Sequence, residues 1–379
     1  MVYLEDSLEK NQSFLDFFED FDDPRIDRKK LHVVQEIMLV MLAAVICGAD
    51  GWNDVEKFGK AKIDELRKYL PFENGIPSDD TLRRFFRRVD PGKFKEKFIT
   101  WVRTIKLPRD NIIAIDGKVS RHSFSDDKSA LHMVSAFASE ARLVLAQTSV
   151  SEKSNEITAI PTLLDWLDLR GAIVTIDAMG CQREISEKIT NSGGDYILAL
   201  KGNQSNLHED IALLFADKEL ERDEVVSIAE EVDGDHGRIE TRQCRCLLMP
   251  KVLKEQHKWP GLKTIVEISA TREIKKTGEI SKEKRYYISS LNKDANKINS
   301  AIRSHWAIEN SLHYILDVSF RDDDSRIRLG NAPENIGIIK HVALNMLQAN
   351  KQKRDSIKGL RKVAAWDHNR MHQILNQKF

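Results

Sequence analysis

Apolar positions along the chain first follow a helical spacing and then change, near Pro108, to short continuous runs. The spacing before that point predicts helices over residues 34–47, 52–69 and 91–102. Another helix is predicted to begin after Ser78, a candidate N-cap that follows a proline and precedes two aspartates. Residues 1–107 are therefore expected to form an all-helical N-terminal domain.

The continuous apolar runs after Pro108 are typical of buried strands. They predict strands over residues 112–116, 132–137, 143–150, 173–177 and 196–200. Helices are predicted between them, over residues 157–167 and 183–190. This hairpin-then-crossover order matches an RNase H-like mixed sheet, in which the first and fourth strands lie side by side. The chain is therefore expected to have an α/β fold, with the first part of its core at residues 108–204.

A strand-rich stretch then interrupts this core. The pattern predicts four more strands, over residues 225–232, 239–248, 263–271 and 285–290. They place a β-rich insertion at residues 205–291. A long helix over 296–316 follows, and two more helices are predicted near 333–348 and 358–375. Residues 292–379 are therefore expected to complete the core and to form the C-terminal helices.

Three acidic residues occupy notable places in these elements. Asp116 and Asp177 each follow four apolar residues, and Glu309 lies in the apolar stripe of the helix over 296–316. Adjacent strand ends would bring the two aspartates together, where their charges repel unless a cation or a proton intervenes. A Glu309 carboxylate buried in the stripe would likewise need a cation or hydrogen bonds. The alternatives are ordinary turns after the two strands and, for Glu309, an ion pair with Arg303 in the same helix or a salt bridge between domains.

Mg²⁺ meets this need, because it prefers oxygen ligands and keeps several waters, so that two or three carboxylates suffice. Two such ions about 4 Å apart would clamp the attacking and leaving oxygens of a phosphodiester. The three acids therefore indicate a two-metal phosphoryl-transfer site for Mg²⁺, with Mn²⁺ as a substitute. A rival site of His305, Glu309 and His313, spaced four apart, would suit a transition metal. The His-Glu-x-x-His motif of zinc hydrolases is absent.

Composition and charge add two expectations. The longest apolar stretch is too short to span a bilayer, the N-terminus is acidic rather than signal-like, and the four cysteines are few. We therefore expect a reduced, cytoplasmic protein without a membrane partner. The net charge is zero, but residues 78–106 hold nine bases and four acids, and residues 321–379 hold twelve bases and six acids. Such local basic regions suit an anionic partner, and a solvated helix face is the alternative.

The motifs around the acids resemble those of the DDE transposases of bacterial insertion sequences. Residues 114–118 (AIDGK) resemble the first-aspartate motif, and residues 175–179 (TIDAM) resemble the second. Residues 305–313 (HWAIENSLH), with 316–320 (LDVSF), resemble the glutamate motif. Further matches are residues 153–157, 199–204 and 236–242. The resemblance covers nearly the whole chain and is nearest to the H-repeat-associated transposase-like proteins. It implies an RNase H-like catalytic core, a helical N-terminal domain and a strand-rich insertion before the glutamate.

Several further side chains are candidates for contacts at such a site. The candidates for DNA binding are Lys118, Lys201, Arg303, Arg83, Arg84, Arg87, Arg88, Arg238 and Arg242. The candidates for a supporting role around the acids are Glu156 and Asn310. Each has an ordinary alternative: a surface lysine for Lys118, a helix-dipole acid for Glu156, and salt bridges with Glu240 for the pair in the insertion. The acids at 317 and 322–324 are expected to pair with the arginines at 321, 326 and 328.

The leading interpretation is a metal-dependent DNA transposase. Water would attack a phosphodiester at an element end, and the exposed 3′-hydroxyl would then attack target DNA. The expected partner is double-stranded DNA, at element ends and at the target, bound by a homo-oligomer. Two alternatives remain open. One is a DNA-binding protein derived from a transposase that lacks transposition activity, which the intact acids disfavour. The other is a stand-alone metal-dependent nuclease.

Overall fold

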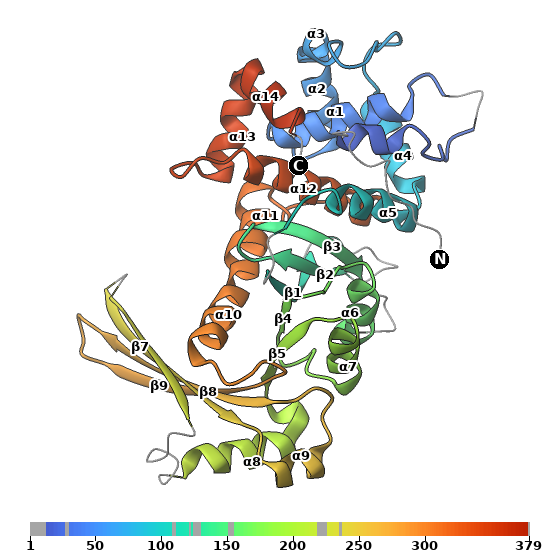
Figure 1. Ribbon diagram of the computed structural model, residues 1–379. Coiled ribbons are helices and arrows are strands. Elements are labelled where there is room, and N and C mark those ends of the chain that lie inside the picture. The colour runs from blue at the N-terminus through green and yellow to red at the C-terminus, as the bar shows by residue number, and fades with distance from the viewer. Residues whose placement is uncertain are drawn as a thin grey trace.

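The computed structural model describes residues 13–26, 30–107, 111–120, 123, 130–150, 155–217, 226–234 and 237–377. In Figure 1 a helical region, built from the first and the last helices of the chain, lies against one end of a long mixed sheet. The predicted boundary at Pro108 lies outside the described residues, as do Lys153, Ser154 and His236 of the quoted motifs.

The N-terminal region is helical, as predicted. Its elements are η1 (Phe14–Phe18), α1 (Val34–Ile46), α2 (Trp52–Ala61), α3 (Ile63–Leu66), α4 (Asp79–Arg88) and α5 (Pro91–Val102). Helix α1 is almost wholly buried, which explains its continuous apolar sequence. The predicted cap of α4 is confirmed, because the Ser78 hydroxyl accepts a hydrogen bond from the amide of Thr81 at 3.3 Å. The helix predicted over 52–69 is divided into α2 and α3 at Lys62.

The predicted arrangement of the core strands is confirmed. The strands are β1 (Ile112–Ser120), β2 (Leu131–Ala138), β3 (Leu143–Ser149), β4 (Ile173–Ile176) and β5 (Asp195–Leu200). The helices between them are α6 (Glu156–Leu164) and α7 (Arg183–Asn191). Strand β1 pairs antiparallel with β2 and parallel with β4, and β4 pairs parallel with β5. The first and fourth strands are therefore neighbours, in the mixed sheet expected of an RNase H-like fold.

Strand β1 is longer than predicted, so Asp116 does not end it. Asp116 lies in mid-strand, opposite Ser135 of β2. The parallel ladder with β4 nevertheless stops one residue earlier, at the pair Ile115 and Ile176. Asp116 is thus the first residue of β1 beyond the end of β4, and Asp177 directly follows β4. The two aspartates meet because β4 ends, while the antiparallel pairing with β2 carries β1 onward.

The strand-rich insertion continues the core sheet. Its strands are β6 (Ser227–Asp233), β7 (Arg238–Leu248), β8 (Thr264–Ile274) and β9 (Ile280–Ser289). Strand β9 pairs antiparallel with β5, which gives one nine-stranded sheet in the order β3-β2-β1-β4-β5-β9-β8-β7-β6. The segment also contains two helices that the apolar pattern did not predict, α8 (Ser205–Ala216) and α9 (Lys251–His257). In Figure 1 strands β7 to β9 extend away from the helical region.

The helix predicted over 296–316 is interrupted at the glutamate. It consists of α10 (Ala295–Ile308), a π-helical turn η5 (Glu309–His313) and α11 (Tyr314–Ser319). Helix α10 packs on β1 and β4. The last helices are α12 (Ala332–Ala349), which packs on α1, α5 and β3, α13 (Ile357–Trp366) and α14 (His368–Leu375). Among the described residues, every helix is too short or too polar to cross a membrane.

Candidate active site

The three predicted acids line one cavity. Asp116, Asp177 and Glu309 all border a space of about 440 Å³ between β1, β4, β5, β9 and α10. The DNA-binding candidate Lys201, at the end of β5, lines the same cavity. The topology explains the convergence: β1 and β4 bring the aspartates to one sheet edge, and α10 crosses these strands and carries the glutamate over them.

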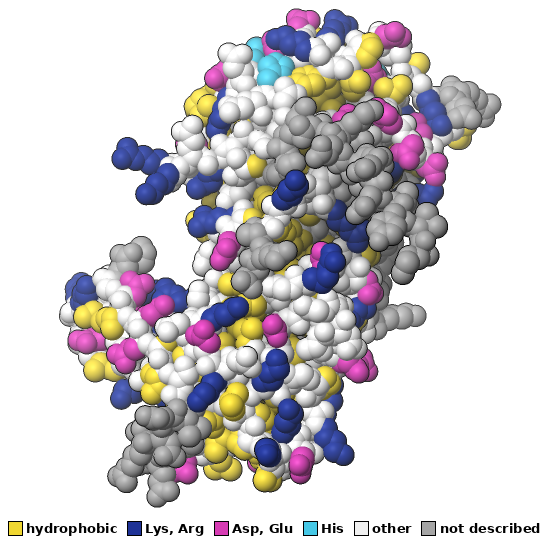
Figure 2. All heavy atoms as spheres, in the orientation of Figure 1, with side chains coloured by type: hydrophobic (Ala, Val, Ile, Leu, Met, Phe, Trp, Pro, Cys, Tyr) yellow, Lys and Arg dark blue, Asp and Glu magenta, His cyan; other side chains and the backbone are white. Residues whose placement is uncertain are grey.

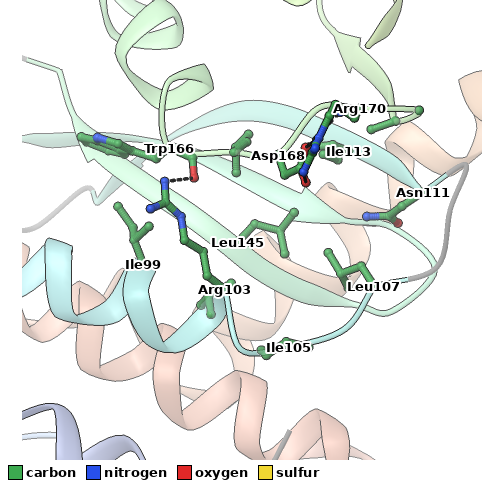
Figure 3. A pocket seen from close by; sticks show the side chains of 14 residues that line it. Ile99, Arg103, Ile105, Leu107, Asn111, Ile113, Leu145, Trp166, Asp168 and Arg170 are labelled. Carbon is green, nitrogen blue, oxygen red and sulfur yellow. Dashed lines mark hydrogen bonds and ion pairs between the residues drawn. The ribbon is translucent and has the colours of Figure 1, made fainter. Parts of the chain in front are cut away.

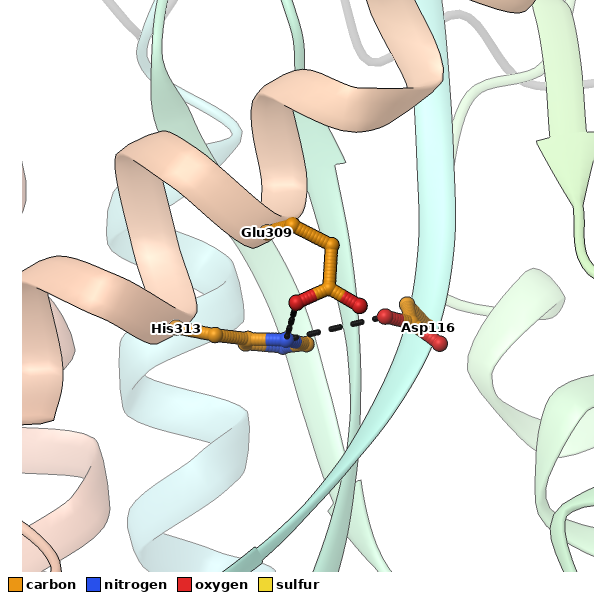
Figure 4. A group of neighbouring side chains, drawn as sticks. All are labelled: Asp116, Glu309 and His313. Atoms are coloured by element: carbon orange, nitrogen blue, oxygen red, sulfur yellow. Dashed lines mark ion pairs between the residues drawn. The ribbon is translucent and has the colours of Figure 1, made fainter. Parts of the chain in front are cut away.

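His313 contacts both Asp116 and Glu309, although the sequence suggested this residue only for the rival metal site. The His313 Nδ1 atom lies 3.6 Å from Asp116 Oδ2 and 3.5 Å from Glu309 Oε2 (Figure 4). In the described part of the chain, these three residues form the one group whose possible metal-ligand atoms all lie within 4.8 Å of one another. The spacing of four between Glu309 and His313 was the available sequence signal.

Asp116 carries a strongly perturbed carboxyl group. Its side chain is only 15% exposed, and the amide of Gly117 donates to its Oδ1 at 2.9 Å. Burial raises the pKa of Asp116 to about 8, and the nearby carboxylates of Glu309 and Asp177 add to the effect. A divalent cation between these groups would reverse this, because it favours the ionised form.

Asp177 is held by the turn that follows β4. Its Oδ1 accepts hydrogen bonds from the amides of Met179, at 3.1 Å, and Gly180, at 3.3 Å. It borders the cavity but does not belong to the close group of Asp116, Glu309 and His313. Two of the three acids, Asp116 and Glu309, therefore lie in one close group, and Asp177 lies at the wall of the same cavity.

Glu309 is the first residue of the π-helical turn. The side chain of Glu309 is 50% exposed, whereas Ile308 and Leu312 on either side are fully buried. Trp306, an aromatic residue three positions before Glu309, is 43% exposed at the cavity wall. A π turn adds a residue to the helical repeat and shifts the phase of the stripe, and such turns are frequent at functional sites.

The rival transition-metal site does not form. The Nδ1 atom of His305 lies 3.0 Å from the hydroxyl of Thr175 in β4, and burial lowers the pKa of His305. His305 is absent from the close ligand group, in which Asp116 joins Glu309 and His313 instead. The histidine therefore ties α10 to the strand that precedes Asp177.

Glu156 lies at the border of the site, paired with a histidine. Its Oε1 is 2.8 Å from Nε2 of His132, and burial together with the charge of Asp177 raises its pKa. A Cβ atom at Gly117 would lie 2.1 Å from Glu156 Oε1 and 2.6 Å from His132 Nε2. The glycine after Asp116 is therefore needed for this pair to approach the strand. Asn310, the other supporting candidate, is exposed on the π turn.

Lys118 belongs to a partly buried ion network. Its side chain is 12% exposed, and its Nζ lies 2.7 Å from Asp317 and 3.3 Å from Asp323. Asp322 is 3.8 Å from Lys118 and 2.6 Å from Lys340 of α12. The expected pairing of these acids with arginines is thus wrong for Asp317 and Asp322. It is confirmed for Asp324, which pairs with Arg321 at 3.0 Å.

The arginine candidates differ in how far they are engaged. On α4, Arg83 pairs with Asp79 at 2.9 Å and Arg84 pairs with Asp80 at 2.8 Å. Arg87 and Arg88 on the same helix are exposed. In Figure 2 basic side chains are scattered among acidic ones over the visible face. The acids of α4 therefore offset the first two arginines of this helix.

Two further candidates are tied to the insertion. Arg303 pairs with Glu231 of β6 and lies 3.9 Å from Asp233, so it joins α10 to the insertion. Arg242 lies 3.2 Å from Glu240, which is the salt bridge expected as the alternative to DNA binding, whereas Arg238 is exposed at the start of β7.

Basic and aromatic residues of β9 complete the cavity. Arg285 lines it and places its guanidinium 5.4 Å from the centre of the Trp306 ring. Lys284 and Tyr287 also line the cavity. These residues were not among the candidates predicted from sequence, although the run Lys284-Arg285-Tyr286-Tyr287 places two basic residues directly before two aromatic rings, a signal for nucleic-acid contact.

A larger cavity of about 1120 Å³ lies elsewhere, between α5, β1, β3 and the segment 166–172. Figure 3 shows that its wall is mostly apolar, with Arg103 donating to the carbonyl of Trp166 at 3.0 Å. Its one lining carboxylate, Asp168, pairs with Arg170 at 2.7 Å. The smaller cavity, which the three acids line, is therefore the candidate active site.

Comparison with known proteins gives a consistent result. A family model described as "Transposase DDE domain" matches residues 107–346, and one described as "DDE_Tnp_1-associated" matches residues 15–102. The "H repeat-associated putative transposase YhhI" of Escherichia coli K12 is 42% identical over 361 residues, 93% of this chain and 95% of that protein. The "Putative transposase YncI" of Escherichia coli O157:H7 is 41% identical over 377 residues, 96% and 94%. A solved piggyBac transposase synaptic complex has a TM-score of 0.41 at 11% identity, covering 95% of this chain and 74% of that one, a likeness too low to support an argument.

Proposed function

Because the chain belongs to the family of proteins with a transposase DDE domain, we propose that it cuts DNA at the ends of a mobile element and joins the freed 3′-hydroxyls to target DNA. The observation that carries this proposal is the convergence of Asp116, Asp177 and Glu309 in one cavity. In both steps an oxygen nucleophile, first water and then a 3′-hydroxyl, attacks a phosphodiester. One set of carboxylates can therefore serve both steps.

Membership of the family implies the use of a divalent metal, and we propose Mg²⁺, with Mn²⁺ as a substitute. Asp116, Asp177 and Glu309 would hold it, since hard cations take carboxylate oxygens. The close approach of Asp116 and Glu309, within 4.8 Å of each other and of His313, supports this fit. When bound, two such ions would neutralise charge on the attacking and leaving oxygens.

The surrounding side chains hold the acids in place and do not themselves react. His313 contacts the carboxylates of both Asp116 and Glu309, so it orients the pair. Backbone amides hold one oxygen of Asp177. We propose that Glu156 supports the strand beside Asp116 and that Asn310 makes a supporting contact next to Glu309. Catalysis would then rest on positioning and charge neutralisation, without a covalent enzyme intermediate.

We propose that DNA approaches the cavity across its basic wall. Lys201 is exposed there, and Arg285 lies beside Trp306. Of the arginine candidates, Arg87, Arg88 and Arg238 are exposed and so are the best placed for phosphates. The remaining candidates already pair with acids, which DNA would have to displace: Lys118, Arg83, Arg84, Arg303 and Arg242.

The proposal extends to the domains and to the assembly. The helical segment 1–107 is proposed to contact DNA, the segments 108–204 and 292–379 to form the catalytic core, and the insertion 205–291 to meet DNA near the cut. Transposition brings two element ends to one target, and a homo-oligomer would supply one active site for each end. We therefore propose that the protein acts on double-stranded DNA as a homo-oligomer.

The test is cleavage and strand transfer in Mg²⁺ or Mn²⁺, using DNA that carries the sequences flanking the gene. Asp116→Asn, Asp177→Asn and Glu309→Gln should each reduce both reactions at least a hundredfold, because each removes a metal ligand. Asp168→Asn, which changes a carboxylate of the other cavity, should keep wild-type rates. Full cleavage by any of the three variants would remove that residue from the site.

The same assay separates the alternatives. Cleavage without joining would indicate a nuclease, and binding without cleavage would indicate a DNA-binding protein derived from a transposase. The insertion is tested by Arg238→Ala combined with Arg242→Ala, which should slow cleavage without unfolding the protein. A wild-type rate in this double variant, at low protein concentration, would mean that this part of the insertion is scaffolding.

A further inference from the structure

The segment after β5 is hydrogen-bonded to the turn that follows Asp177. Asn203 and Gln204 lie in the short 3₁₀ turn η3 (Gly202–Gln204), between β5 and α8. The carboxamide nitrogen of Asn203 donates to the carbonyl of Ala178 at 2.7 Å. That of Gln204 donates to the carbonyl of Cys181 at 3.0 Å. Two neighbouring amide side chains therefore hold the first and the last residue of the turn 178–181.

This turn supplies the hydrogen bonds that orient Asp177. The amides of Met179 and Gly180, in the middle of the turn, donate to Oδ1 of Asp177 at 3.1 and 3.3 Å. The turn is closed by the amide of Cys181, which donates to the carbonyl of Ala178 at 3.2 Å. A shift of either anchored carbonyl would therefore move the two amides that fix the carboxylate.

The turn needs outside anchors, because the sheet no longer supports it. The parallel ladder of β4 stops at Ile176, so the backbone from Asp177 onward has no strand partner. The turn also lies close against the end of that strand. A Cβ atom at Gly180 would approach Cγ2 of Ile176 to 2.3 Å. The position of the turn is thus limited on one side by β4 and fixed on the other by Asn203 and Gln204.

We infer that Asn203 and Gln204 are positioning residues that set the geometry of Asp177 for metal binding. This inference rests on the proposed function for the metal, but it concerns residues that do not touch the metal or the DNA phosphates. Asn203 is exposed and adds nothing to the hydrophobic core, so its bond to Ala178 is its evident contribution. The same short segment begins with Lys201 at the cavity wall, so it joins the basic wall to the Asp177 turn.

The test compares Asn203→Ala and Gln204→Ala with a matched control, Asn206→Ala. Asn206 is another exposed asparagine, three residues further on α8, and its side chain meets only a weak contact from Ser205 at 3.5 Å. Metal affinity is read from the rise in melting temperature on titration with MnCl₂ or MgCl₂. Removal of a hydrogen bond behind a metal ligand should weaken apparent affinity about tenfold. Melting temperatures without metal should stay within about 2 °C of wild type.

Two further readouts distinguish positioning from general stability. Amide hydrogen exchange of a peptide covering residues 177–182 should become about tenfold faster in Asn203→Ala, while peptides from β1 and α10 keep wild-type rates. In cleavage assays the metal concentration for half-maximal rate should rise about tenfold. The rate at saturating metal should recover to within about threefold of wild type.

Wild-type metal affinity and wild-type exchange in both Asn203→Ala and Gln204→Ala would overturn the inference. If one variant fails to fold, the other decides, because each anchors a different end of the turn. A wild-type protein that cleaves no DNA would refute the proposed function alone, and the exchange rates of the turn would still decide the positioning role. A uniform increase in exchange across the sheet would also overturn it, since that pattern belongs to loss of global stability.

Discussion

Removing the charge of Asp116 is expected to stabilise the metal-free protein at neutral and higher pH. Burial raises the pKa of Asp116 to about 8, from an ordinary value of 3.8, and the charge of Glu309 adds to this effect. Ionising this carboxyl group therefore costs more free energy in the folded protein than in the unfolded chain. In Asp116→Asn that cost disappears, because an amide of the same shape stays neutral at every pH.

The sign and size of the effect follow from the two pKa values. Because the folded value is the higher one, the wild-type protein is most favoured below about pH 4 and loses stability as the pH rises to about 8. Each pH unit in this window corresponds to about 1.4 kcal/mol, which gives an upper limit of about 6 kcal/mol. The cavity is open to water and the side chain of Glu309 is 50% exposed, so screening reduces the effect. We expect ~3 kcal/mol, or ~4 °C in melting temperature for a chain of this length.

The assay is thermal unfolding in a metal chelator, from pH 4 to pH 9, for wild type, Asp116→Asn and Asp168→Asn. Arg170 holds the pKa of Asp168 at about 2, so that control does not titrate in this window. Near pH 4 the melting temperatures of wild type and Asp116→Asn should differ only by a constant offset. The difference between them should grow as the pH rises towards 8. Adding Mg²⁺ at pH 8 should then stabilise wild type more than the variant. A difference that stays constant with pH would refute the reasoning.

Three other variants test separate parts of the structure. Replacing Arg87 and Arg88 by alanine should flatten the slope of log DNA affinity against log salt concentration by about 0.9 for each phosphate that α4 no longer neutralises. An unchanged slope would give α4 a structural role only. Gly117→Ala should abolish cleavage while secondary structure persists, because its Cβ would displace Glu156, whose Oε1 would lie 2.1 Å away; normal cleavage would show that this pair can move freely. Arg361→Ala should destabilise the protein by about 3 kcal/mol in denaturant unfolding, because this buried side chain donates to backbone carbonyls near the ends of α1 and α11, and a destabilisation below about 1 kcal/mol would contradict that account.

Local sequence determined the core strands and pointed to the three acids. Apolar runs such as 173–176 are buried on both faces, so their pattern can be read without knowing the partner strand. The cap at Ser78 is equally local, because a hydroxyl and an amide three residues apart make it. The order of strands and helices then restricted the topology enough to place β1 beside β4, and with it Asp116 near Asp177.

Tertiary pairing decided how far each element extends. Residues 117–120 (Gly-Lys-Val-Ser) lie beyond the continuous apolar run that predicts the strand, yet they continue β1 because β2 offers them a complete antiparallel ladder. The insertion became part of the core sheet through the pairing of β9 with β5, which joins segments about 90 residues apart. Hydrogen bonds between distant segments leave no periodic trace in either one, so the apolar pattern could not reveal them.

The fine geometry of the site likewise depended on the folded molecule. The π turn that presents Glu309 breaks the regular helical repeat on which a sequence prediction of its face relies. Lys118 was a candidate for phosphate contact from its sequence position alone. In the fold it is paired with three aspartates from the segment after α10. The sequence thus determined which residues could carry the chemistry. Only the tertiary structure decided which of them meet, because charge pairing and burial are set by neighbours that are remote along the chain.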